Sequence, residues 1–179
     1  MSLGFLRETE EFKGLLRAIR QGEKGLRVTG LVDPAKAYFL SVLVKESNKR
    51  IIFIQPHSSS LPRMEEECGF YLDQFSSNVR LSSLPSLSEN PYQEIFPPLD
   101  SISSRMRFFS DLIRRQPPLI LTHLLGLLRP FPGPQNIKSL FLELEVGGSG
   151  GRDRVLDIIE GYGYTREDLV NSAGEYAWR

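Results

Sequence analysis

The apolar residues of this chain recur with two different periods, which predict helices alternating with short strands. Apolar side chains follow helical spacing over residues 5–20, 35–44 and 61–75. Residues 50–54 instead form one compact apolar run between turn signals, which is typical of a strand buried on both faces. The same patterns predict strands over residues 26–29, 78–81 and 117–122, and helices over residues 101–115 and 124–128.

This alternation predicts an α/β fold. Strands that alternate with helices form right-handed βαβ units and a mostly parallel sheet flanked by helices. The proline-rich stretch Pro130–Pro134 breaks the pattern and predicts a domain boundary. We therefore expect an α/β domain over residues 1–133 and a small α+β domain over residues 134–179.

The second predicted domain is too short to bury a large core alone, so we expect it to lean on the first. Residues 140–146 alternate in part between apolar and polar positions, which predicts a half-exposed strand. A glycine-rich hinge over residues 147–151 precedes a predicted helix over residues 152–160. Residues 163–179 mix turn residues with short strand-like pieces.

The composition is that of an ordinary globular protein. The 179 residues carry 22 basic and 22 acidic side chains, so a basic excess that would favour nucleic-acid binding is missing from the chain as a whole. The single cysteine, Cys68, cannot form an internal disulfide, which fits a reducing cytoplasm. The sequence has no signal-peptide pattern and no apolar run of membrane-spanning length. We expect a cytoplasmic protein that does not contact a membrane.

The segment from Gly30 to Ala37 has the pattern of a phosphate-binding loop that has lost its chemistry. A working loop reads G-x-x-x-x-G-K-[ST], in which the glycines expose backbone N–H groups, the lysine reaches phosphate and the hydroxyl holds Mg²⁺. Gly30 and Lys36 stand at the required spacing, but Ala35 replaces the second glycine and Ala37 replaces the hydroxyl. We therefore expect a degenerate P-loop-like domain with no bound cofactor and no ATP hydrolysis. The alternative is nucleotide binding by Lys36 with an unconventional magnesium site.

Other candidate chemistry is weaker. His57 lies beside three serines, a residue combination that turns use far more often than catalysis does. His57 and His123 have no partner at metal-ligand spacing, so we expect no catalytic residue and no metal site. Asp100 is expected to cap the helix over residues 101–115. This helix carries four arginines that offer a second alternative, direct DNA binding: Arg105, Arg107, Arg114 and Arg115.

Three patches resemble one known family. The first is the degenerate loop from Thr29 to Ala37. The second, residues 90–105, resembles L-P-Y-D-x-F-S-P-x-x-D-x-x-S-x-R with four departures. The third, residues 163–179, is close to G-Y-x-x-x-D-x-V-x-x-x-G-E-[YF]-A-x-R. With these patches in order along nearly the whole chain, the sequence resembles the N-terminal region of the bacterial transcription-repair coupling factors (Mfd), which is similar to the excision-repair protein UvrB.

The resemblance implies a helicase-like fold without ATPase activity, whose partner is the excision-repair protein UvrA. In the family this region recruits UvrA to stalled RNA polymerase, while contacts to DNA and to the polymerase belong to later domains that this chain lacks. The G-E-Y-A-x-R motif maps the partner-binding residues onto Glu175, Tyr176 and Arg179. The chain is then expected to end within the UvrA-binding module, so this surface would be incomplete.

The resemblance also separates the chain from UvrB, which clamps damaged DNA with a long, tyrosine-rich β-hairpin. The corresponding stretch over residues 89–99 is short and holds a single tyrosine, Tyr92. Such a stretch is too short to reach across a duplex and has no row of rings to stack on bases. We therefore do not expect damage verification of the UvrB kind, and a UvrB-like DNA-binding fragment remains an alternative.

Overall fold

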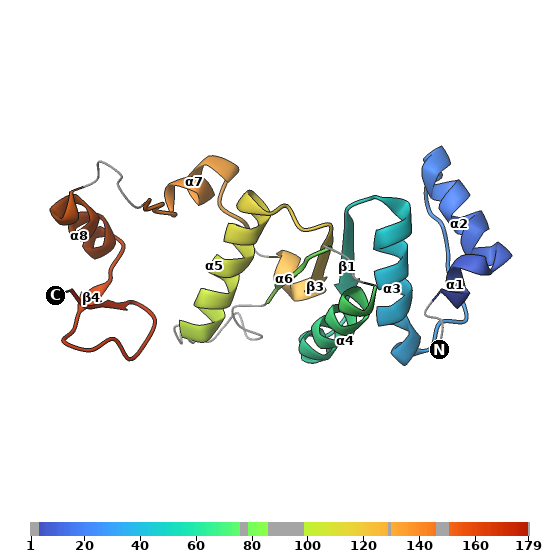
Figure 1. Cartoon of the computed structure of the whole chain (residues 1–179), viewed down its shortest axis with the longest axis horizontal. Helices are drawn as coiled ribbons and strands as arrows, with labels where there is room; N and C mark the ends of the chain where they lie inside the picture. The colour runs from blue at the N-terminus through green and yellow to red at the C-terminus, as the bar shows by residue number, and fades with distance from the viewer. Residues whose placement is uncertain (1–3, 76–78, 86–98, 129, 146–150, 179) are drawn as a thin grey trace.

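The computed structural model has a three-stranded parallel sheet at its centre (Figure 1). It describes residues 4–75, 79–85, 99–128, 130–145 and 151–178. The strands are β1 (Ile51–Gln55), β2 (Leu81–Leu84) and β3 (Leu119–His123), arranged in the order β1-β3-β2. In register, Ile51 of β1 and Leu81 of β2 both lie opposite Leu119. The prediction of an α/β fold with a parallel sheet is therefore confirmed.

Two helices cover one face of the sheet and one helix covers part of the other. On the first face, α3 (Asp33–Ser47) and α4 (Leu61–Gln74) enclose a core with Leu119 and Leu121 of β3. On the second face, α5 (Leu99–Arg114) packs its two phenylalanines, Phe108 and Phe109, against a smaller core around β2 and β3. Short connecting elements complete this part of the chain: η1 (Ser58–Ser60) after β1 and α6 (Leu124–Leu128) after β3.

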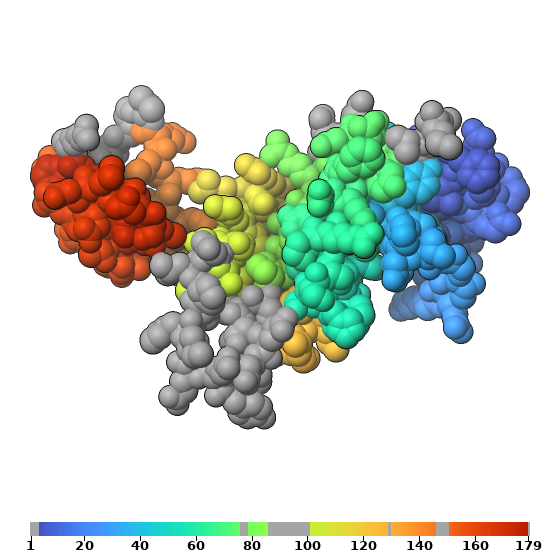
Figure 2. Space-filling view, turned by 90° about the horizontal axis from the view of Figure 1, so that it is seen from below, coloured from blue at the N-terminus to red at the C-terminus, as the bar shows by residue number. Residues whose placement is uncertain are grey.

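The remaining elements lie at the two ends of the molecule (Figures 1 and 2). At one end, α1 (Phe5–Glu8) and α2 (Glu10–Gln21) lie beside α3, and the ring of Phe12 meets that of Phe39 edge-on at 6.0 Å. At the other end, α8 (Arg152–Gly161) packs with a parallel pair of very short strands, β4 (Thr165–Arg166) and β5 (Glu175–Tyr176). Between this end and the sheet lies α7 (Pro134–Ser139), whose Ser139 carbonyl accepts a hydrogen bond from the Tyr162 hydroxyl at 2.8 Å.

Most predicted elements are present, but three boundaries were wrong. The predicted helix over residues 5–20 is divided at Thr9, whose extended backbone ends α1 and whose hydroxyl accepts from the Phe12 N–H to cap α2. The strand predicted over residues 78–81 begins only at Leu81. Since α5 begins at Leu99, Asp100 lies within its first turn rather than in front of the helix.

The strand predicted over residues 26–29 is absent, which corrects the expectation that it would enter the loop from the sheet. Gly25 and Gly30 have φ angles of 72° and 83°, so the chain turns on both sides of this short segment. Its residues are exposed, and it pairs with no described strand. The strand predicted over residues 140–146 is also wrong over its described part, because residues 140–145 are not in a strand.

The expectation that β1 is buried on both faces was wrong. Ile51 and Phe53 pack against the core under α3 and α4, whereas Ile52 and Ile54 are 57% and 49% exposed. The physical reason is that β1 is an edge strand and α5 covers only the part of the second face formed by β2 and β3. No helix in the described part of the chain is long and apolar enough to cross a membrane.

Candidate functional site

The segment that resembles a phosphate-binding loop leads into α3, but its side chains are engaged elsewhere. Ala37, at the position of the magnesium-binding hydroxyl, is fully buried in the core between α3 and α4. The Lys36 ammonium pairs with the Asp33 carboxylate, with Nζ and Oδ1 2.5 Å apart. The hydrogen bond from Lys36 holds the pKa of Asp33 below its usual value. The lysine that would contact phosphate is therefore occupied by a carboxylate of the same helical turn.

A pocket of about 310 Å³ adjoins this loop at the carboxyl end of β1. Its two cations are both neutralised: Lys36 by Asp33, and Arg63 by Glu67, whose Oε1 lies 2.7 Å from the arginine Nε. Gln55 is buried in its wall, where its Oε1 accepts a hydrogen bond from Ser60 and its Nε2 lacks a partner. A pocket with balanced charge, beside a loop with alanine in place of the Mg²⁺-binding hydroxyl, is a poor match for a triphosphate.

We expect calorimetric titration of this protein with Mg-ATP to show no binding heat at micromolar protein concentrations. We expect no binding heat because Ala37 offers only a buried methyl group and because Lys36 is already paired with Asp33. The matched variant is Lys36→Ala, which removes the remaining loop cation. Micromolar binding that disappears in Lys36→Ala would establish the nucleotide-binding alternative.

Two other candidate residues from the sequence, Ser60 and Cys68, have structural contacts. Ser60 donates its hydroxyl hydrogen bond to the side-chain carbonyl of Gln55 at 2.6 Å, so this serine is engaged by an amide and not by an imidazole base. Cys68 is fully buried, and burial raises the pKa of its thiol to about 11. Within the described residues there is no group of three or more His, Cys, Asp or Glu side chains that could hold a metal ion.

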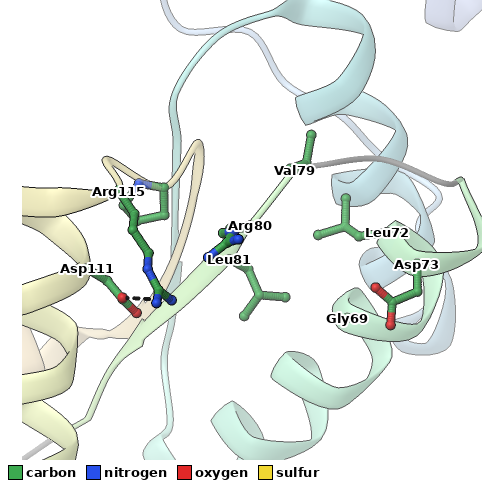
Figure 3. Close-up of a pocket in the computed structure, with 9 residues that line it drawn as sticks. Gly69, Leu72, Asp73, Val79, Arg80, Leu81, Asp111 and Arg115 are labelled. Carbon is green, nitrogen blue, oxygen red and sulfur yellow. Dashed lines mark ion pairs between the residues drawn. The ribbon is translucent and has the colours of Figure 1, made fainter.

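Three of the four arginines in and just after α5 are engaged by other groups, whereas Arg107 is exposed and makes no ion pair with a described residue. Arg105 is 6% exposed, donates to the Pro85 carbonyl at 2.9 Å and stacks on the ring of Phe109. Arg114 pairs with Glu143 at 3.0 Å. Arg115 pairs with Asp111 at 3.3 Å, on the wall of a hollow of about 250 Å³ between α4 and α5 (Figure 3). Arg107 is thus the one exposed arginine of the four without an ion pair in the described part of the chain, which disfavours the DNA-binding alternative for the helix.

The C-terminal end carries the most distinctive surface in the described part of the chain. The guanidinium groups of Arg152, at the start of α8, and Arg166, in β4, each lie 4.5 Å from the ring centroid of Trp178. Trp178 follows β5 and is 38% exposed. We call these three residues the arginine–tryptophan stack. Sequence reasoning missed both arginines, because they lie 26 and 12 residues before the tryptophan and only the fold brings them to it.

The three predicted partner-binding residues adjoin this stack in sequence. Tyr176 is 8% exposed, and its hydroxyl donates a hydrogen bond to Glu160 of α8. The Glu175 carboxylate accepts hydrogen bonds from the backbone N–H groups of Asn171 and Ser172 and from the Ser172 hydroxyl. Glu175 and Tyr176 thereby fix the turn and the strand that lead to Trp178. Arg179 lies outside the described residues.

The turn held by Glu175 is expected to loosen in acid. Hydrogen bonds from Ser172 and Asn171 lower the pKa of Glu175 from its ordinary value of 4.5. A carboxyl group whose pKa is lowered by folding stabilises the folded form above that ordinary value, and the stabilisation disappears as the pH falls through the folded pKa. We expect the fluorescence of Trp178, the only tryptophan, to report a transition below pH 4.5. Glu175→Gln should abolish this transition, and an unchanged profile in that variant would contradict the assignment.

The fold and site together define a small α/β protein with a parallel sheet, a segment that resembles a degenerate phosphate-binding loop, and an exposed cationic–aromatic surface. No protein-family model matches the chain. The transcription-repair-coupling factor of Bacillus subtilis (strain 168) is 24% identical over 175 residues, which cover 98% of this chain and 14% of that protein. The factor of Staphylococcus haemolyticus (strain JCSC1435) is 25% identical over 158 residues, which cover 88% of this chain and 13% of that protein. The chain is therefore related to the transcription-repair-coupling factors, as its motifs predicted, and spans a small part of their length.

Proposed function

We propose that this chain is a non-catalytic module of transcription-coupled DNA repair that recruits UvrA to stalled RNA polymerase. The arginine–tryptophan stack is the observation that carries this proposal. Tryptophan and arginine are the residues most enriched among those that dominate the binding energy of protein interfaces. The stack presents both types on one exposed surface, next in sequence to the predicted contact Arg179.

In this proposal Arg179 contacts the partner, and the other two predicted residues, Glu175 and Tyr176, position it. Arg179 supplies a planar guanidinium that suits a paired contact with a carboxylate on UvrA. Glu175 and Tyr176 hold the turn 171–175 and β5 in place, so they position the contact residues rather than touch the partner. The polymerase and DNA would be contacted by regions of the relatives outside the segment that matches this chain.

The experiment is a titration of purified UvrA with this chain and with a longer chain that extends it as in its relatives. The longer chain is expected to bind more tightly, and it carries the variants Arg179→Ala and, as control, Arg154→Ala. Arg154 is an exposed arginine of α8 outside the stack. We expect Arg179→Ala to weaken binding by about 1–3 kcal/mol because it removes one charged interface contact, and Arg154→Ala to have no effect. Unchanged affinity of Arg179→Ala would remove Arg179 from the interface, and no UvrA binding by any form of the protein would contradict recruitment by this surface.

A further inference from the structure

We propose that the outer side of α2 binds the phosphate backbone of a nucleic acid. Lys13, Arg17 and Arg20 are spaced four and three residues apart in this helix, so they lie along one side of it. We call these three residues the α2 stripe. Two more cations, Lys24 and Arg27, follow in the exposed segment after the helix.

The positive charge of this region is not balanced locally. Residues 10–27 contain five cations and three acids (Glu10, Glu11 and Glu23), an excess of two cations, although the whole chain carries equal numbers of each. Arg17 makes no ion pair with any residue that the structure describes. Lys13 pairs with Glu10 at 2.8 Å, so its charge is balanced in part by that acid. Arg20 donates to the Glu46 backbone carbonyl, which does not neutralise its charge.

The dimensions of the stripe match those of a nucleic-acid strand. Lys13 to Arg20 span seven residues of helix, or about 10 Å at the helical rise. One strand of duplex DNA presents a phosphate about every 3.4 Å along the axis, so the three cations lie opposite about three phosphates. A hollow of about 410 Å³, lined by the stripe together with Leu16 and Gln21, opens on this side of the helix.

The packing of α2 favours a nucleic acid over a lipid surface. A helix that lies on a membrane inserts an apolar face between the headgroups. In α2 that face is already occupied, because Phe12 is buried and its ring meets Phe39 of α3. The exposed residues of α2 are charged, polar or glycine, and Leu16, which lines the hollow, is itself partly buried. The stripe also lies at the opposite end of the molecule from the arginine–tryptophan stack, so the two surfaces do not overlap (Figure 1).

The test is fluorescence anisotropy of a labelled DNA duplex and a labelled RNA strand at several salt concentrations. The variant Lys13→Gln/Arg17→Gln/Arg20→Gln removes the stripe, and Lys49→Gln/Lys138→Gln/Arg154→Gln removes the same charge from other exposed positions. We expect the slope of log affinity against log salt concentration to fall by about 2–3 in the stripe variant and to change by less than about 1 in the control. Comparison of the two probes identifies which nucleic acid is preferred.

The single variant Arg17→Gln keeps the test valid if the triple variant unfolds, since Arg17 makes no described ion pair. It should lower the same slope by about 1. Equal slopes for the stripe and control variants would overturn the proposal, as would no binding of either probe at low salt. Stripe-dependent binding to anionic phospholipid vesicles without nucleic-acid binding would also overturn it, in favour of a membrane surface.

Discussion

Leu121→Ala is expected to destabilise the protein by about 2–5 kcal/mol, the usual range for truncating a buried leucine. Leu121 is fully buried in the central strand β3, where it belongs to the core enclosed by α3 and α4. Truncation removes its apolar contacts and leaves a cavity that strands paired on both sides cannot collapse to fill. Urea unfolding followed by circular dichroism measures the change.

Ile52→Ala is the matched control, because Ile52 lies in the same sheet but is 57% exposed. A side chain that stays largely in water on folding gains little from burial, so we expect this change to cost less than about 1 kcal/mol. Equal costs for the two substitutions would show that the second face of β1 is covered in solution, which the arrangement of α5 does not provide.

These two positions show what could be predicted from the sequence. The alternation of apolar runs and helical periods was sufficient to predict the parallel sheet and its main helices. The exposure of Ile52 could not be predicted, because the same apolar run can form a central strand or an edge strand, and the residue pattern does not distinguish the two. The order β1-β3-β2, which makes β1 an edge strand, is set by pairing between segments more than sixty residues apart.

The candidate site likewise has features that could be predicted from the sequence and features that could not. Loss of the magnesium-binding hydroxyl at Ala37 is a local feature, and it could be read directly from the spacing Gly30 to Ala37. The engagement of Lys36 by Asp33 follows from helical spacing, yet it needed the helix to begin at Asp33. The stack of Arg152 and Arg166 on Trp178 has no signal in residue spacing, because it depends on how α8 packs against β4 and β5.

Trp178→Ala is expected to weaken UvrA binding by about 2–4 kcal/mol, in the range of dominant interface residues. The indole supports both Arg152 and Arg166, so truncation removes the aromatic contact of both guanidinium groups, although Arg152 keeps its ion pair with Asp153 at 3.2 Å. The control Tyr164→Ala removes another exposed ring of the same end of the molecule. Calorimetry with UvrA measures both, and circular dichroism checks that each variant is folded.

A double-mutant cycle tests whether the stack acts as one unit. If Trp178 holds Arg166 in its binding position, the costs of Trp178→Ala and Arg166→Ala overlap, and the double variant costs less than their sum by at least about 0.5 kcal/mol. If each residue meets UvrA independently, the two costs add. Additive costs would contradict the positioning role of the stack but keep both residues in the interface. Full affinity of Trp178→Ala would show that UvrA docks on another surface. The cycle therefore separates the positioning role of the stack from its direct contacts with UvrA, because the two costs overlap only where the ring preorganises the guanidinium group.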